Sequence, residues 1–208
     1  MIQNLIDLLF TCANYLISHT SKNSCNTDGH FTTYSGTRFS LLNPTIDMIN
    51  IDDIALGLAY KPHFSGFTPK FFSIAEHSII VYKLYKNRFP DDIEGQLCAL
   101  LHDASESYTN DIIKPLKNLL PNFVVIENRI SKTIYEKYGL DYKSKKDKVK
   151  YFDIIVQDIE ANLFYNNVNS LIDDKEIIEY LNCDLAKSYF KELFNELYIK
   201  LKTNENNI

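Results

Sequence analysis

Two histidines and one aspartate stand out because their types and spacing suit metal binding. His77 lies on an apolar helical stripe with Ile74 and Val81, and a single histidine in such a position is usually a hydrogen-bonded core residue. His102 and Asp103 are consecutive. On a helix their directions differ by about 100°, yet both can reach one ion near the end of the helix. This pair makes a second imidazole and a carboxylate available to the same site.

Three further carboxylates follow in the sequence. Glu106 comes one helical turn after the His–Asp pair, and Asp111 begins a short loop. Asp153 lies on the apolar side of a later helix. Taken alone, Asp153 is best interpreted as a helix-face acid that forms a salt bridge with Lys150 or Lys146.

Taken together, two imidazoles and two carboxylates on inward-facing positions of three predicted helices form one set of donors. Mixed nitrogen and oxygen donors bind Mn²⁺, Co²⁺, Ni²⁺ or Fe²⁺ and, with less preference, Mg²⁺. We therefore expect one divalent metal ion per chain, with coordination positions left for water and a substrate oxygen. The expected ligands are His77, His102, Asp103 and Asp153.

The elements that must position these residues are helices. Ser73 and Glu76 form a predicted capping box, with both side chains bonded to the first free N–H groups of a helix that runs to about Arg88. Gly139 predicts the left-handed C-cap of a later helix. No stretch of real length alternates with period two, so the fold class is all-α, a single irregular bundle. The predicted helices cover residues 51–60, 74–88, 91–104, 121–138, 145–165 and 184–202.

The N-terminal segment and the composition of the chain narrow its possible partners and location. Residues 1–17 have apolar side chains at helical spacing without the basic start of a signal peptide or the length of a membrane span. We expect an amphipathic helix and linker over residues 1–30, packed on the domain formed by residues 31–208 or on a partner chain, as in a homo-oligomer. The net charge of −5 disfavours binding to long nucleic acid. Four scattered cysteines without a C-x-x-C pair suit a reducing cytoplasm.

The order of these residues resembles the H…HD…D pattern of the HD-domain metal-dependent phosphohydrolases. The runs Phe72–Ser78 and Leu101–Lys117 resemble the bacterial 5′-deoxynucleotidase branch of this family. The segments Tyr34–Phe39 and Leu42–Pro44 are similar to a leader found in related phage dATP triphosphohydrolases. The His–Asp pair alone is a weak motif, whereas the run Leu101–Lys117 together with the upstream run Phe72–Ser78 is specific. The similarity covers about residues 31–163 and implies an HD-type helical bundle.

The resemblance also implies roles for individual residues. It assigns the four metal ligands named above, makes Glu106 the catalytic carboxylate, and gives Asp111 a contact to the nucleotide or to water. Lys117 matches a family lysine that binds the substrate. The family has an Arg–Trp pair where this chain has His63 and Phe64, so His63 replaces the phosphate-binding arginine and Phe64 remains able to stack on a base or sugar.

Arg38 is the alternative phosphate ligand, because the chain has only three arginines and the other two lie on predicted helices. The leading expectation is an enzyme that releases phosphate from deoxynucleoside 5′-monophosphates. A dNTP triphosphohydrolase is the alternative. A degenerate HD domain that only binds a nucleotide or a protein is the third interpretation, and the intact set of donors argues against it.

Overall fold

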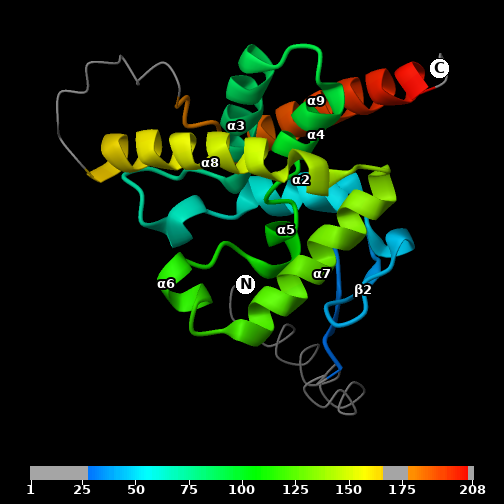
Figure 1. The fold of residues 1–208 in the computed structure, drawn as a ribbon. Coiled ribbons are helices and arrows are strands. Elements are labelled where there is room, and N and C mark those ends of the chain that lie inside the picture. Colours follow the sequence, from blue (N-terminus) through cyan, green and yellow to red (C-terminus); the bar gives the residue numbers. More distant parts are fainter. Residues whose placement is uncertain (1–27, 166–177, 206–208) are drawn as a thin grey trace, which may run out of the picture.

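The computed structural model describes residues 28–165 and 178–205. Helices dominate this part of the chain, and its strands are confined to one hairpin (Figure 1). The expected all-α class is therefore confirmed. The helix predicted over residues 1–17 lies outside the described residues. The described elements are β1 (His30–Thr32), β2 (Arg38–Ser40), η1 (Ile46–Met48), α2 (Ile51–Tyr60), η2 (His63–Gly66), α3 (Ile74–Arg88), α4 (Ile93–Leu100), α5 (Glu106–Thr109), α6 (Lys114–Lys117), α7 (Pro121–Tyr138), α8 (Tyr142–Tyr165) and α9 (Cys183–Glu205).

Local sequence signals located several helix ends correctly. The Ser73 hydroxyl accepts the backbone N–H of Glu76 at 3.1 Å, and α3 ends at Arg88 as expected. Gly139 adopts a φ of 68° and terminates α7. The expected start of α8 was wrong by three residues, because the helix already begins at Tyr142.

The second half of the predicted capping box is wrong. The Glu76 carboxylate does not turn back to its own helix; it accepts the backbone N–H groups of Glu179, Tyr180 and Leu181 at 2.8–2.9 Å. An ionised carboxylate that accepts three N–H groups makes strong, charge-assisted hydrogen bonds. Glu76 therefore fixes the segment before α9 to the first turn of α3.

The His102–Asp103 pair does not lie on a helix, contrary to the expectation. Helix α4 ends at Leu100, and the chain continues through tight turns into α5. The N–H of Ala104 bonds to the carbonyl of Leu101 at 3.0 Å, and that of Glu106 to the carbonyl of Asp103 at 2.9 Å. These bonds span three residues each, so the backbone winds more tightly than an α-helix over this stretch.

The hairpin is the one sheet in the described residues, and its strands are too short to show a period-two pattern. It pairs Phe31 with Phe39 and Thr32 with Arg38. Tertiary contacts stabilise it: Phe39 is fully buried, and its ring stacks on that of Tyr108 in α5 with centroids 4.1 Å apart. The hairpin is thereby attached to the short helix that begins with Glu106.

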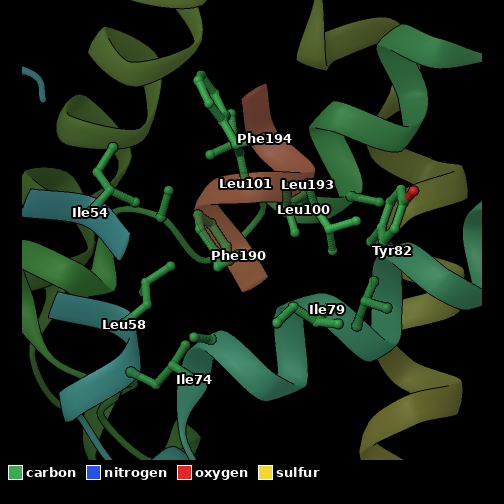
Figure 2. Close-up of a cluster of buried hydrophobic side chains, with 14 of the residues drawn as sticks. Ile54, Leu58, Ile74, Ile79, Tyr82, Leu100, Leu101, Phe190, Leu193 and Phe194 are labelled. Atoms are coloured by element: carbon green, nitrogen blue, oxygen red, sulfur yellow. The ribbon is translucent and has the colours of Figure 1, made fainter. Parts of the chain in front are cut away.

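The core forms where α9 crosses α2, α3 and α4, and α8 packs on the other side against α3 and α4 (Figure 1). None of the helices in the described ranges is both long and apolar enough to cross a bilayer. Close packing of this kind leaves little room for side-chain movement, so α3, α8 and the turn after α4 are held in fixed positions. Figure 2 shows buried side chains of this core, among them Ile54, Leu58, Ile74, Ile79, Leu100 and Phe190.

Candidate metal centre

The four predicted metal ligands come from three elements and meet in the interior. His77 is in the first turns of α3, Asp153 is in the middle of α8, and His102 and Asp103 lie in the turn after α4. His77 is completely buried, and the side chains of His102 and Asp153 are each 5% exposed. The packing of α3 between α4 and α8 therefore brings the sequence-distant residues together.

The distances between donor atoms suit a single cation. The Nε2 atom of His77 is 3.2 Å from Oδ1 of Asp153, and the Nε2 atom of His102 is 3.5 Å from the same oxygen. Oδ2 of Asp103 is 3.0 Å from His102 Nε2 and 3.6 Å from His77 Nε2. Donors about 2.1 Å from one ion are about 3.0 Å apart at right angles and about 3.4 Å apart in a tetrahedron. The buried group of His77, His102 and Asp153 can thus hold a metal ion.

The histidine in the turn also shows a polar atom that lacks a partner. The Nδ1 atom of His102 is 2.9 Å from the carbonyl of Ala99, so this nitrogen carries the proton as the donor. Its Nε2 atom is buried and makes no hydrogen bond of good geometry within the described chain. This nitrogen faces Oδ2 of Asp103 at 3.0 Å and Oδ1 of Asp153 at 3.5 Å, and a cation between these atoms would give all three a partner. The residues present therefore fit a divalent cation.

The two oxygens of Asp153 have different surroundings. Oδ2 pairs with Lys150 at 2.6 Å, as the helix-face interpretation predicts. Oδ1 faces His77 and also accepts the side-chain N–H of Gln157 at 2.7 Å. Burial raises the pKa of Asp153, but the two histidines lower it by more, so it stays well below its usual range.

When no cation is bound, the ionisable groups of the cluster shift one another's pKa values strongly. Burial lowers the pKa of His77, but the charge of Glu160 and the hydrogen bonds to Asp153 and Glu160 outweigh burial and raise this pKa to about 10. Burial raises the pKa of Asp103, whereas the charge of His102 lowers it to about 2. Metal binding must displace protons from such imidazoles, because only their neutral form is a ligand.

Glu106 lies beside this cluster and faces Lys117. It is 6% exposed; Oε1 is 3.4 Å from the Lys117 Nζ atom, and Oε2 has no hydrogen-bond partner in the described residues. Burial and the charges of Asp103 and Asp111 raise the pKa of Glu106 well above its usual range, although Lys117 lowers it. A buried carboxyl group with a raised pKa is the type of group that can donate a proton.

Two residues that the sequence analysis missed support Glu106. The Nζ atom of Lys61 donates to the carbonyls of Glu106 and Ser107, the first at 3.0 Å, and fixes the backbone of α5. Glu127 on α7 accepts from Lys117 at 2.8 Å and shares that lysine with Glu106. The sequence does not indicate either residue, because each contact joins two different elements. Lys61 follows α2 and contacts α5, and Glu127 on α7 contacts Lys117 of α6.

Asp111 and His63 form a second cluster next to the first. The Nδ1 atom of His63 is 3.2 Å from Oδ2 of Asp111, and its Nε2 atom is 3.4 Å from Oε2 of Glu160. His63 is only 6% exposed. Both ring nitrogens face carboxylates, so this structure does not present either of them to an incoming phosphate. That placement runs against the phosphate-binding role predicted for His63.

The other two predicted substrate contacts are farther from the metal ligands. Phe64 is half-buried and packs edge-on against Phe164 and Tyr165, with ring centroids 5.9 and 6.0 Å away. The Arg38 side chain is 68% exposed and pairs with Asp28 at 3.1 Å. Within residues 28–165 and 178–205, the structure does not bring Arg38 into contact with the metal centre.

Glu160 is the most central residue that the sequence analysis missed. It is fully buried, and its carboxylate oxygens are 2.9 and 3.1 Å from the Nδ1 atom of His77. Its position follows Asp153 by seven residues on α8, almost two full helical turns, so both carboxylates lie on one face. That spacing is the signal that could have found it.

Comparison with known proteins shows similarity without a named activity. No family model matches the chain. The chain is 38% identical to the uncharacterized protein YfdR of Escherichia coli K12 over 124 residues, which cover 60% of this chain and 66% of the relative. It is 38% identical to an uncharacterized protein of Rhodobacter capsulatus over 110 residues, which cover 51% of this chain and 56% of the relative. The matches span less than two thirds of either relative.

Proposed function

We propose that the protein is a metal-dependent phosphohydrolase that acts on nucleotides, with deoxynucleoside 5′-monophosphates as substrates. The observation that carries this proposal is the meeting of His77, His102, Asp103 and Asp153 around one point beside a buried carboxyl group, Glu106. The resemblance of residues 31–163 to HD-domain phosphohydrolases supports it. The free thiols of Cys98 and Cys183 are consistent with the proposed reducing cytoplasm.

The four residues would hold one divalent ion, Mn²⁺, Co²⁺, Ni²⁺, Fe²⁺ or Mg²⁺. When bound, the ion polarises a phosphoryl oxygen and lowers the pKa of its bound water. The protein itself supplies the orientation of the ligands. The Ala99 carbonyl holds Nδ1 of His102, and Lys150 and Gln157 hold Asp153.

Glu106 would move the proton of the reaction. Its raised pKa keeps the carboxyl group protonated, which favours donation to the leaving oxygen over removal of a proton from water. Lys61 fixes the backbone of this residue, and Lys117 lies close enough to adjust its charge. Product formation would thus depend on a proton held at Oε2 of Glu106, the oxygen without a hydrogen-bond partner in the described residues.

The substrate would bind on the side of the site that carries Asp111 and Lys117. Lys117 retains an exposed fraction of 24%, which leaves its ammonium group accessible to a phosphoryl oxygen. Charge neutralisation of this kind provides most of the catalysis in phosphoryl transfer. Asp111 would position a sugar hydroxyl or water, and Phe64 would contact the base or sugar.

A dNTP triphosphohydrolase is the second candidate, and the hairpin favours it. Phe39 stacks on Tyr108 of α5, so the hairpin that carries the exposed Arg38 is attached to the helix that carries Glu106. An accessible guanidinium on this hairpin offers an additional contact for a longer phosphate chain. The first candidate requires no such contact.

A metal-dependent screen separates these functions. The full chain is treated with a chelator, reloaded with each metal ion, and incubated with nucleoside mono-, di- and triphosphates, and the products are identified by chromatography. Release of orthophosphate from monophosphates supports the first candidate, and release of tripolyphosphate supports the second. Nucleotide binding without turnover under every metal would contradict both and indicate a binding module.

A further inference from the structure

We propose that Glu160 is a positioning residue of the metal centre: it holds the His77 ring with the proton on Nδ1 and the lone pair of Nε2 toward the metal, and it connects this ring through His63 to Asp111. The inference rests on the proposed metal centre, but it concerns residues that no ligand pattern in the sequence assigns. It also gives His63 a role other than phosphate binding.

The His77 ring lies between Glu160 and the proposed metal site. Glu160 contacts Nδ1 at 2.9 Å, whereas Nε2 on the other side of the ring faces Asp153 at 3.2 Å and Asp103 at 3.6 Å. A neutral imidazole has one N–H, and an ionised carboxylate can only accept a hydrogen bond. Glu160 therefore selects the tautomer whose free lone pair points at the metal site. Metal-binding histidines commonly have such an outer partner.

His63 lies beside His77. Its ring stacks on that of His77 with centroids 4.2 Å apart and an interplanar angle of 27°. The stacked rings therefore present nitrogen atoms to the same carboxylate, and Nε2 of His63 is 3.4 Å from Oε2 of Glu160. At the opposite end of the ring, Nδ1 of His63 is 3.2 Å from Asp111. The four side chains lie next to one another in the order Asp111, His63, Glu160 and His77; Glu160 and His77 are hydrogen-bonded, and the two His63 contacts are ion-pair distances.

Glu160 itself is buried between the two histidines. Its side chain is 1% exposed, and a buried carboxylate is very unfavourable without partners. Oε1 is 2.9 Å from Nδ1 of His77, and Oε2 is 3.4 Å from Nε2 of His63. Each carboxylate oxygen therefore has an imidazole nitrogen beside it.

A second metal ion held by His63, His77 and Glu160 is the competing interpretation, since these donors also lie close together. It would require His77 to give both ring nitrogens to metal ions and to lose both ring protons. The single-ion arrangement leaves the proton on Nδ1 of His77, where it is donated to Glu160. One bound ion per chain is therefore part of the inference.

The test compares Glu160→Gln with wild type in the full chain. The amide offers one acceptor oxygen to two ring nitrogens and has no charge, so we expect Co²⁺ affinity to fall about 10–100-fold. Asp158→Asn makes the same chemical change at an exposed position two residues earlier on α8 and serves as the control, with affinity within about twofold of wild type. Affinity is measured by competition with a chromophoric chelator, and circular dichroism checks the fold of each variant.

A second measurement reads the tautomer directly. Nitrogen-15 NMR of histidine in the Zn²⁺-loaded protein should show His77 with a proton on Nδ1 and the metal on Nε2, and Glu160→Gln should shift or broaden the Nδ1 signal. Unchanged Co²⁺ affinity in folded Glu160→Gln, two ions per chain, coordination through Nδ1, or no Co²⁺ binding by wild type would overturn the inference. Because no substrate is used, normal results with an inactive protein would contradict only the proposed function.

Discussion

The candidate metal centre and the rim beside it are built in different ways. The centre places His77, His102 and Asp153, all nearly inaccessible, on or beside long packed helices. The rim, defined as residues 63–66 and 110–117, consists of short turns. In the rim three non-glycine residues, Phe64, Ser65 and Asn110, have positive φ angles of 52°, 51° and 74°.

The surface of the rim differs as well. Ile113 and Leu116 are large apolar residues with exposed fractions of 41% and 45%. Strained backbone and exposed apolar side chains both reduce folding stability. They are found preferentially at sites that bind a ligand or a partner. The comparison indicates that core packing fixes the geometry of the proposed ligands, and in the proposed enzyme the rim would determine which substrate is accepted.

The largest effect is expected when a ligand is removed from the centre. Asp153→Ala should lose its bound metal and all metal-dependent turnover, because the two histidines lose one of the two carboxylate oxygens that both of them face. Elemental analysis of the purified protein measures this, and Asp158→Asn is the control. Full metal content in the variant would mean that Asp153 serves only its salt bridge with Lys150.

A smaller loss is expected from the carboxyl group between the centre and the rim. Glu106→Gln should keep its metal and fold but lose about 10²–10⁴ in kcat, the usual contribution of a proton donor. Steady-state kinetics and metal analysis of the same Glu106→Gln sample test this prediction. If metal is lost together with activity, Glu106 is a ligand, and normal turnover would remove it from the mechanism.

The stability of the metal-free centre should depend on pH. The folded state raises the pKa of His77 to about 10 from an ordinary 6.5, so folded protein retains a proton that unfolded protein releases between these values. Stability from this group is complete below pH 6.5 and is lost as pH rises toward 10, by at most about 1.4 kcal/mol per pH unit.

Urea unfolding of chelator-treated protein at pH 6.5 and 8.5 measures this slope. His77→Gln should reduce it without abolishing it, because the similarly raised pKa of His102 then remains, and His30→Gln, which changes a histidine in the hairpin, should leave it as in wild type. A wild-type protein whose free energy of unfolding does not fall over this range contradicts the coupling of His77 to its carboxylates.

The smallest effect is expected at the rim. Asn110 has φ 74° and ψ 158°, a region that glycine alone occupies readily. Asn110→Gly should therefore raise the free energy of unfolding by about 1 kcal/mol. Glycine relieves the backbone strain, and this gain exceeds the conformational entropy that glycine loses on folding. Asn118→Gly, at a helical φ of −64°, should instead lower it by about 0.5–1 kcal/mol. Equal effects at the two positions would show that Asn110 stores no strain.

The sequence by itself determined the helical class and several helix ends, because caps act between near neighbours. Ser73 is bonded to a backbone N–H only three residues away, and Gly139 ends α7 through its own φ angle. The spacing of His77, His102, Asp103 and Asp153 also predicted that they would meet, since each lies on an inward-facing position. Their roles as ligands stay a prediction.

Only the tertiary structure decided which groups surround those ligands. Glu160 contacts His77 across 83 positions, and Glu76 binds backbone N–H groups more than 100 positions away instead of its own helix end. Likewise His63 turned inward because the folded chain places the buried Glu160 and the partly buried Asp111 beside it. Local patterns cannot predict such choices, because the partner of a buried polar group is set by whichever donor or acceptor the packing of α3 and α8 brings within reach.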